Sequence, residues 1–250
     1  MQPERDAERD KMRADALPLT CPVCNFFFIT WEVKSFGYET RRTDFRPNYS
    51  GDNPMELFYH MCTRCRFCAD QEYFSLDIEW GKRKPLEDGL AVLYKEFGPD
   101  IGKSLSAKLL YGALVGDLLQ SLDLIDEPLH DRTMSYVQSF WWSREEEQTK
   151  YGDAALIKLK DTAHALDKAS EDYLYTLYMI GEISRRIGRM SDAHLYFEKL
   201  QSLRPEREND SNRFLFDLAK QQMTDPQDMM PEESLNPYNG NGGAGKPVNR

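Results

Sequence analysis

The sequence lacks several features on which whole classes of protein depend. It has no run of eighteen apolar residues, so it predicts no transmembrane helix and no membrane partner. The charged start, MQPERDAERDKMRADA, contains no apolar stretch, which predicts that no standard secretory signal is present and favours a cytoplasmic protein. Basic residues are outnumbered by acidic ones, 32 to 42, and the formal net charge of −10 disfavours general binding to nucleic acid.

Recognisable catalytic motifs are also missing. The sequence contains neither H-E-x-x-H nor H-x-E followed by P-C-x-x-C, which are typical of zinc hydrolases and zinc deaminases. A G-x-S-x-G nucleophile motif is absent as well. The four histidines are scattered along the chain. We therefore expect that the protein is not an enzyme.

Cysteine is confined to five positions between residues 21 and 68. Four of them form two C-x-x-C pairs, Cys21/Cys24 and Cys62/Cys65. Each pair predicts a tight turn whose backbone N–H groups point at the thiolates, and two such turns supply four ligands for tetrahedral Zn²⁺ at ~2.3 Å. The alternative is four inert buried thiols, which the repeated spacing disfavours. Because four thiolates fill the coordination shell, we expect a structural zinc and no catalytic metal.

The segment between the two pairs is 37 residues long, so it must fold by itself. The stretches 26–34 and 55–61 are rich in aromatic and β-branched residues and predict strands. The residue after each pair, Asn25 or Arg66, is expected to adopt a positive φ, which asparagine tolerates and arginine adopts at a cost.

Two nearby side chains leave the ligand set open. Cys68 extends the second pair toward an iron–sulfur spacing, but the rest of that motif is missing, which favours a small buried side chain packed beside the site. His60 is interpreted as an ordinary strand histidine. Whether either residue joins the metal site, and whether the metal is zinc or iron, stays open at this point.

From about residue 86 the apolar spacing becomes helical. The pattern predicts helices over 86–97, 104–122, 128–148, 153–169, 172–188, 191–203 and 210–222. Short links between them predict antiparallel neighbours.

One stretch, 174–205, matches the tetratricopeptide pattern more specifically. Gly181 falls where two helices of a repeat pack closest, and Gly188 falls at the turn. Ala193 and Phe197 fall on the inner face of the second helix, and Pro205 is expected to end it. The alternative is a generic helical hairpin, which five matched positions disfavour. A degenerate repeat is expected before this one and a capping helix after it.

Together these patterns predict an α+β fold that is mostly α. A small strand-rich, zinc-ribbon-like N-terminal module is expected before a tetratricopeptide-like helical repeat domain. The expected boundaries are a disordered N-terminus over 1–17, the module over 18–80, the repeat domain over 81–222 and a disordered tail over 223–250.

The inner face of the repeat is the predicted partner site. Its exposed positions are expected at Tyr175, Tyr178, Glu182, Arg185 and Arg186, four of which share one helix face. Tyrosines offer rigid apolar area, and arginines offer planar donors for carboxylates. We therefore expect a protein or peptide partner that carries an acidic group or a free C-terminus. The alternative is that the two arginines are simply solvated.

The chain also resembles a bacterial family of unknown function, DUF2225. The resemblance is carried by CPVC at 21–24, Asp44, Tyr49, Asn53-Pro54, the second C-x-x-C at 62–65, and IGEISRRIGRMSDAHLYFEKL at 180–200. It implies a metal-binding N-terminal module and tetratricopeptide-like repeats, and it implies no activity.

Three functions compete on these observations. A non-enzymatic adaptor with a structural zinc and a partner-binding helical repeat ranks first. A nucleic-acid-associated regulator that uses the zinc module ranks second, because residues 21–68 hold only six basic against five acidic side chains. A metalloenzyme with an atypical site ranks third.

Overall fold

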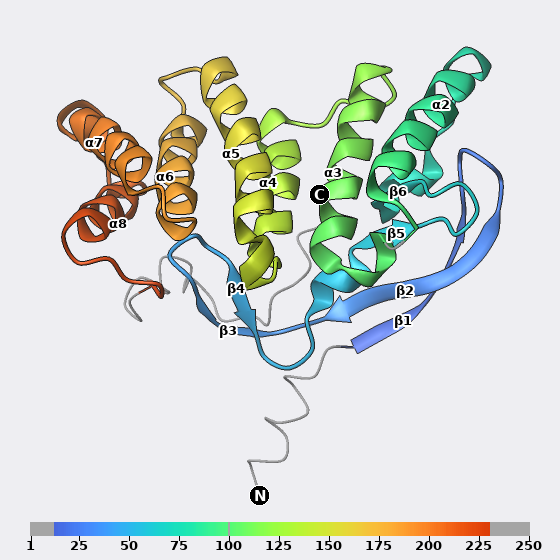
Figure 1. Ribbon diagram of the computed structural model, residues 1–250, viewed down its shortest axis with the longest axis horizontal. Helices are drawn as coiled ribbons and strands as arrows, with labels where there is room; N and C mark the ends of the chain where they lie inside the picture. The colour runs from blue at the N-terminus through green and yellow to red at the C-terminus, as the bar shows by residue number, and fades with distance from the viewer. Residues whose placement is uncertain (1–12, 100, 231–250) are drawn as a thin grey trace, which may run out of the picture. The chain divides into compact units, whose positions relative to one another are not determined.

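The computed structural model of the chain describes residues 13–99 and 101–230 (Figure 1). This part is mostly helical with a strand-rich N-terminal region, as the sequence predicts. It divides into two compact units. Of the described residues, the first unit holds 13–39 and 49–142, and the second holds 40–48 and 143–230. The expected boundary between residues 80 and 81 does not coincide with this division.

The strands of the first unit form short antiparallel pairs. Strand β1 (Arg13–Thr20) pairs with β2 (Phe27–Ser35), and β5 (Tyr59–Met61) pairs with β6 (Cys68–Asp70). Strands β3 (Tyr38–Arg41) and β4 (Pro47–Tyr49) pair with each other where the chain passes between the units. The prediction of disorder over 1–17 is therefore wrong from residue 13 onward, and residues 1–12 lie outside the described part.

The stretch 55–61 is only partly a strand. It begins in the short helix η1 (Pro54–Leu57), where Asn53 accepts a hydrogen bond from the Met55 N–H at 3.0 Å. Proline suits the first turn of a helix, because its missing N–H would have no partner there. Strand pairing therefore starts only at Tyr59.

Three longer helices and two short ones complete the first unit. They are η2 (Gln71–Ser75), α2 (Trp80–Phe97), η3 (Ile101–Lys103), α3 (Leu105–Ser121) and α4 (Leu129–Trp141). Ser104 is the N-cap of helix α3, and its hydroxyl accepts a hydrogen bond from the Ala107 N–H at 3.3 Å. The predicted helix over 128–148 is interrupted after Trp141, next to the boundary between the two units at residues 142 and 143.

The second unit is built from helices. They are η4 (Glu145–Glu147), α5 (Gln148–Ala165), α6 (Glu171–Arg186), α7 (Met190–Arg207) and α8 (Arg213–Thr224). Helices α6 and α7 form a hairpin with Gly188 at the turn, where φ is 81°. A Cβ added to Gly181 would lie 2.6 Å from the Phe197 ring, so the close approach of the two helices depends on this glycine.

Two predictions about this region are wrong. Helix α7 continues through Pro205 to Arg207, because a proline near the end of a helix removes only one late hydrogen bond. The predicted disordered tail starts with ordered residues: the Thr43 N–H donates to the Asp228 carbonyl, and the Met230 N–H to the Arg41 carbonyl, both at 3.0 Å. Residues 231–250 lie outside the described part. Among the described helices, none is both long enough and apolar enough to cross a membrane.

Candidate metal centre

The first cysteine pair lies in the turn between β1 and β2. The Asn25 N–H donates to the Cys21 carbonyl at 2.9 Å, and the Cys21 N–H donates to the Phe26 carbonyl at 3.0 Å. Asn25 has a φ of 56°, as its position after the pair predicts. These bonds fold the turn so that the backbone N–H groups of Val23 and Cys24 point at the Cys21 sulfur.

The second pair lies between β5 and β6 and repeats this geometry. The Arg66 N–H donates to the Cys62 carbonyl at 2.9 Å, and the Cys62 N–H donates to the Phe67 carbonyl at 2.8 Å. Arg66 has a φ of 65°, which confirms the second predicted positive φ. Its guanidinium lies 5.4 Å from the centre of the Tyr94 ring, and this cation–π contact offsets part of the conformational cost.

The two turns bring four sulfur atoms together. The Sγ atoms of Cys21, Cys24, Cys62 and Cys65 all lie within 4.8 Å of one another. Two of these distances cross between the turns, 3.4 Å from Cys21 to Cys65 and 3.6 Å from Cys24 to Cys62. Disulfide sulfurs lie ~2.05 Å apart, so these are free thiols. Four sulfurs at ~2.3 Å from one tetrahedral ion would lie ~3.8 Å apart, and the observed set fits that arrangement.

The thiols polarise one another. The contact between the Cys65 and Cys21 sulfurs, together with the backbone N–H groups, lowers the pKa of Cys21 to about 5 against the opposing effect of burial. The same contact raises the pKa of Cys65 above its ordinary range, and burial raises the pKa of Cys62. A bound cation would replace these shared protons, because the thiolate is the form that binds metal.

Two neighbouring side chains stay outside the cluster. Cys68 is fully buried, burial raises the pKa of its thiol to about 12, and its sulfur does not belong to the group of four. His60 is 3% exposed and its Nδ1 lies 3.2 Å from the Thr30 hydroxyl. The interpretation of Cys68 as a packed side chain agrees with these surroundings.

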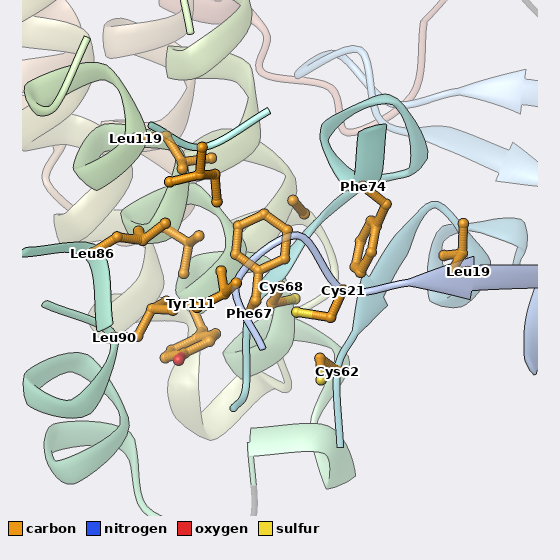
Figure 2. Close-up of a cluster of buried hydrophobic side chains, with 14 of the residues drawn as sticks. Leu19, Cys21, Cys62, Phe67, Cys68, Phe74, Leu86, Leu90, Tyr111 and Leu119 are labelled. Carbon is orange, nitrogen blue, oxygen red and sulfur yellow. The ribbon is translucent and has the colours of Figure 1, made fainter. Parts of the chain in front are cut away.

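The cysteine cluster is continuous with the core of the first unit. Figure 2 shows Phe67 in the middle of that core, with Leu86, Leu119 and Tyr111 on one side of it and Cys21 on the other. Phe67 follows the second turn directly, so the residues that place the sulfurs also pack against α2 and α3. Both Phe67 and Cys62 are fully buried.

The predicted partner-binding residues on α6 are partly buried. Tyr178 and Glu182 are fully buried, and the Tyr178 hydroxyl donates to the Thr43 carbonyl at 2.9 Å. The Tyr175 ring stacks on Phe45 with centroids 5.1 Å apart. Residues 42–46 therefore cover the face on which an open groove was expected.

The two arginines on this face bind carboxylates that belong to the same chain. Arg185 donates to Glu182 through two nitrogens, at 3.0 and 2.9 Å, and to Asp228 at 2.9 Å. Arg186 donates to Glu182 at 2.7 Å and lies 3.4 Å from Asp44. An external partner can reach Tyr178 and Glu182 only if it displaces these segments. Partner binding at the five residues stays a prediction.

Comparison with known families agrees with the cysteine pattern. A family model described as an uncharacterized protein conserved in bacteria (DUF2225) matches residues 17–225. The chain belongs to this family. Comparison with curated proteins and with solved structures finds no match. The family description names no activity, so a function for this DUF2225 member must be argued from its own residues.

Proposed function

We propose that the protein is a non-enzymatic adaptor that holds one structural zinc and binds a partner protein. The observation that carries the proposal is the closed set of four sulfurs within 4.8 Å. Four protein ligands leave no position for a water or substrate, which is the arrangement of a structural zinc site. The metal would cross-link two turns that are 37 residues apart in sequence and both packed in the core.

An exposed apolar row on β2 supports the partner-binding part of the proposal. Phe27, Ile29 and Trp31 are 58%, 66% and 54% exposed, and alternate residues of a strand share one face. On β1, the residues opposite Ile29 and Trp31 are Pro18 and Ala16, which are also exposed and apolar. Contiguous apolar surface of this kind is typical of interaction sites.

The partner we propose for this row is a protein with a complementary apolar surface. A membrane is the other common occupant of such a face, but the net charge of −10 repels the anionic lipids that attract peripheral proteins. The α6 face remains a second contact region, reached by displacement of residues 42–46 and 227–229. Its arginines would then bind carboxylates of the partner instead of Asp44 and Asp228.

The test uses the zinc-loaded full chain as bait in its native host. An Ile29→Ser/Trp31→Ser variant should lose partners that the unaltered chain retains. The matched control is Trp80→Ser, because Trp80 is 92% exposed on α2, outside the apolar row. Each partner is then purified and its direct binding measured. The adaptor proposal is contradicted if no partner is recovered, or if the partners bind the unaltered chain and both variants equally. A catalytic turnover that depends on the metal would contradict it as well.

A further inference from the structure

A cavity of about 620 Å³ lies within the first unit, and the proposed function does not use it. Its walls come from the strand segment around β5 and β6 and from helices α3 and α4. Gly112 and Gly116, one helical turn apart on α3, both line it. A Cβ added to Gly116 would meet no atom within 4 Å, whereas one at Gly112 would lie 2.6 Å from the Tyr59 ring. Gly116 therefore leaves open space beside the helix.

The charges around this cavity are mostly negative. Its lining includes one basic side chain, Arg132, whose Nη1 already lies 3.2 Å from Asp117. Burial, followed by the charge of Asp131, raises the pKa of Glu127. The acidic side chains that line the cavity are Glu32, Asp70, Glu72, Glu127 and Asp131. The lining therefore holds five acidic side chains and one guanidinium, which is paired with Asp117, and this excess of negative charge attracts cations.

Two polar side chains, His60 and Arg132, also line the cavity. His60 lines the cavity and is 3% exposed. Its Nδ1 lies 3.2 Å from the Thr30 hydroxyl. The Nε atom of Arg132 is buried and unbonded in the same part of the chain. An unsatisfied buried donor is costly, so we expect a water inside the cavity to accept a hydrogen bond from Arg132 Nε.

The carboxylates are not arranged for a metal ion. Within the described residues, the four cysteines are the group that brings three or more ligand atoms close enough to hold one. The acidic side chains of the cavity are therefore spread around its wall. Apolar groups lie between them, including Val33, Met55 and Met134. A spread of negative charge with apolar surface between suits an elongated organic cation.

We propose that this cavity binds an amine or guanidinium group carried on an aliphatic stem. The charged group lies among the carboxylates near Glu127, and the stem contacts the apolar wall beside Gly116. The tyrosine rings of the lining, Tyr59 and Tyr73, add faces on which such a cation stacks. This chemistry belongs to a free diamine and also to the lysine or arginine side chain of a partner protein. The proposal does not depend on the adaptor function.

Isothermal titration calorimetry on the zinc-loaded full chain tests the proposal with three cationic probes. These are putrescine, agmatine and the capped peptide acetyl-Ala-Arg-Ala-amide. The neutral control, 1,4-butanediol, has the stem of putrescine without its charges. We expect saturable 1:1 binding of at least one cationic probe and none of the diol. Binding of putrescine or agmatine identifies a free amine as the ligand, and binding of the peptide alone identifies a protein side chain.

Two substitutions locate the binding. Glu127→Gln removes one charge without changing the side-chain shape, and we expect affinity to fall about tenfold, as for the loss of one charge-assisted contact. Gly116→Leu fills the cavity and should abolish binding. The matched controls are Glu96→Gln and Gly81→Leu, both on exposed positions of α2, and each should bind within about twofold of the unaltered chain. If Gly116→Leu does not fold, the Glu127→Gln comparison decides.

The proposal is wrong if no cationic probe binds saturably. It is also wrong if Glu96→Gln weakens binding as much as Glu127→Gln, because the attraction would then come from the general surface charge. Zinc content and partner capture are measured on the same variants. These readouts separate a failure of the cavity proposal from a failure of the adaptor proposal.

Discussion

Glu182 offers the sharpest test of how the second unit is held together. Its carboxylate is fully buried and accepts from the Thr43 hydroxyl at 2.7 Å and from both Arg185 and Arg186. A Glu182→Gln substitution removes the charge and turns an amide N–H₂ toward donors that need an acceptor. Breaking a buried charge pair from one side costs about 3–5 kcal/mol. We expect a loss of this size in the free energy of unfolding of the second unit.

The assay must report on the second unit alone. All four tryptophans belong to the first unit, so the second unit needs a reporter of its own. Amide hydrogen exchange at Thr43 reports on the second unit, because the Thr43 N–H donates to the Asp228 carbonyl. In Glu182→Gln, exchange at Thr43 should accelerate, while amides in the core of the first unit keep their protection.

The matched control is Asp172→Asn, which makes the same change of charge at an exposed position in the first turn of α6. It should cost at most about 1 kcal/mol, through the helix dipole. The reasoning is refuted if Glu182→Gln costs no more than this control. It is refuted equally if Thr43 exchange is unchanged, because residues 42–46 would then be held by other contacts.

Three further predictions use other parts of the structure. Gly181→Ala should destabilise the second unit by about 1–3 kcal/mol in denaturant unfolding, because the new methyl would lie 2.6 Å from the Phe197 ring. Gly116→Ala, whose methyl meets no atom within 4 Å, should stabilise the first unit by up to about 1 kcal/mol, and equal effects of the two substitutions would contradict the packing argument. Arg185 lowers the pKa of Asp228, so the contribution of Asp228 to stability is complete above its ordinary pKa near 3.8 and is lost as the pH falls through the lowered value. Proteolysis near residue 228 should therefore rise only below about pH 4, and a rise at pH 6 would contradict this prediction. Removal of the metal by a chelator should change tryptophan fluorescence and leave most helical circular dichroism of α5 to α8, and complete loss of helicity would show one cooperative unit.

The metal centre was predictable because its signal is local. The C-x-x-C spacing alone fixes a turn in which the following residue has a positive φ, and Asn25 and Arg66 both have it. The hairpin of α6 and α7 was predictable for the same reason. Gly181 and Phe197 lie 16 residues apart and meet because two neighbouring helices place them together. In both cases the pattern and the contact belong to one short stretch of chain.

The contacts on α6 were not predictable, because they join distant segments. Thr43 and Glu182 are 139 positions apart and form a buried hydrogen bond. The sequence predicts that Arg185 and Arg186 bind carboxylates of a partner, whereas in the structure both arginines contact carboxylates of the same chain, among them Asp44 and Asp228. Periodicity marks a helix face without showing what covers it.

The sequence indicates the cavity only weakly. Gly112 and Gly116 are spaced by four on a strongly apolar helix, and such a pair leaves one side of the helix without side chains. The same spacing serves two purposes here, since Tyr59 packs against Gly112 and open space faces Gly116. Only the three-dimensional arrangement separates these roles, because Tyr59 comes from a different element.

The central claim, one structural zinc held by four cysteines, is tested most directly by elemental analysis of the purified full chain and its single variants. We expect one zinc per chain and no iron. Cys21→Ser and Cys62→Ser should each lose the metal, whereas Cys68→Ser, which changes a buried thiol outside the group of four, should retain it. A chain purified without zinc, or a loss of metal in Cys68→Ser as large as in Cys21→Ser, would contradict the account.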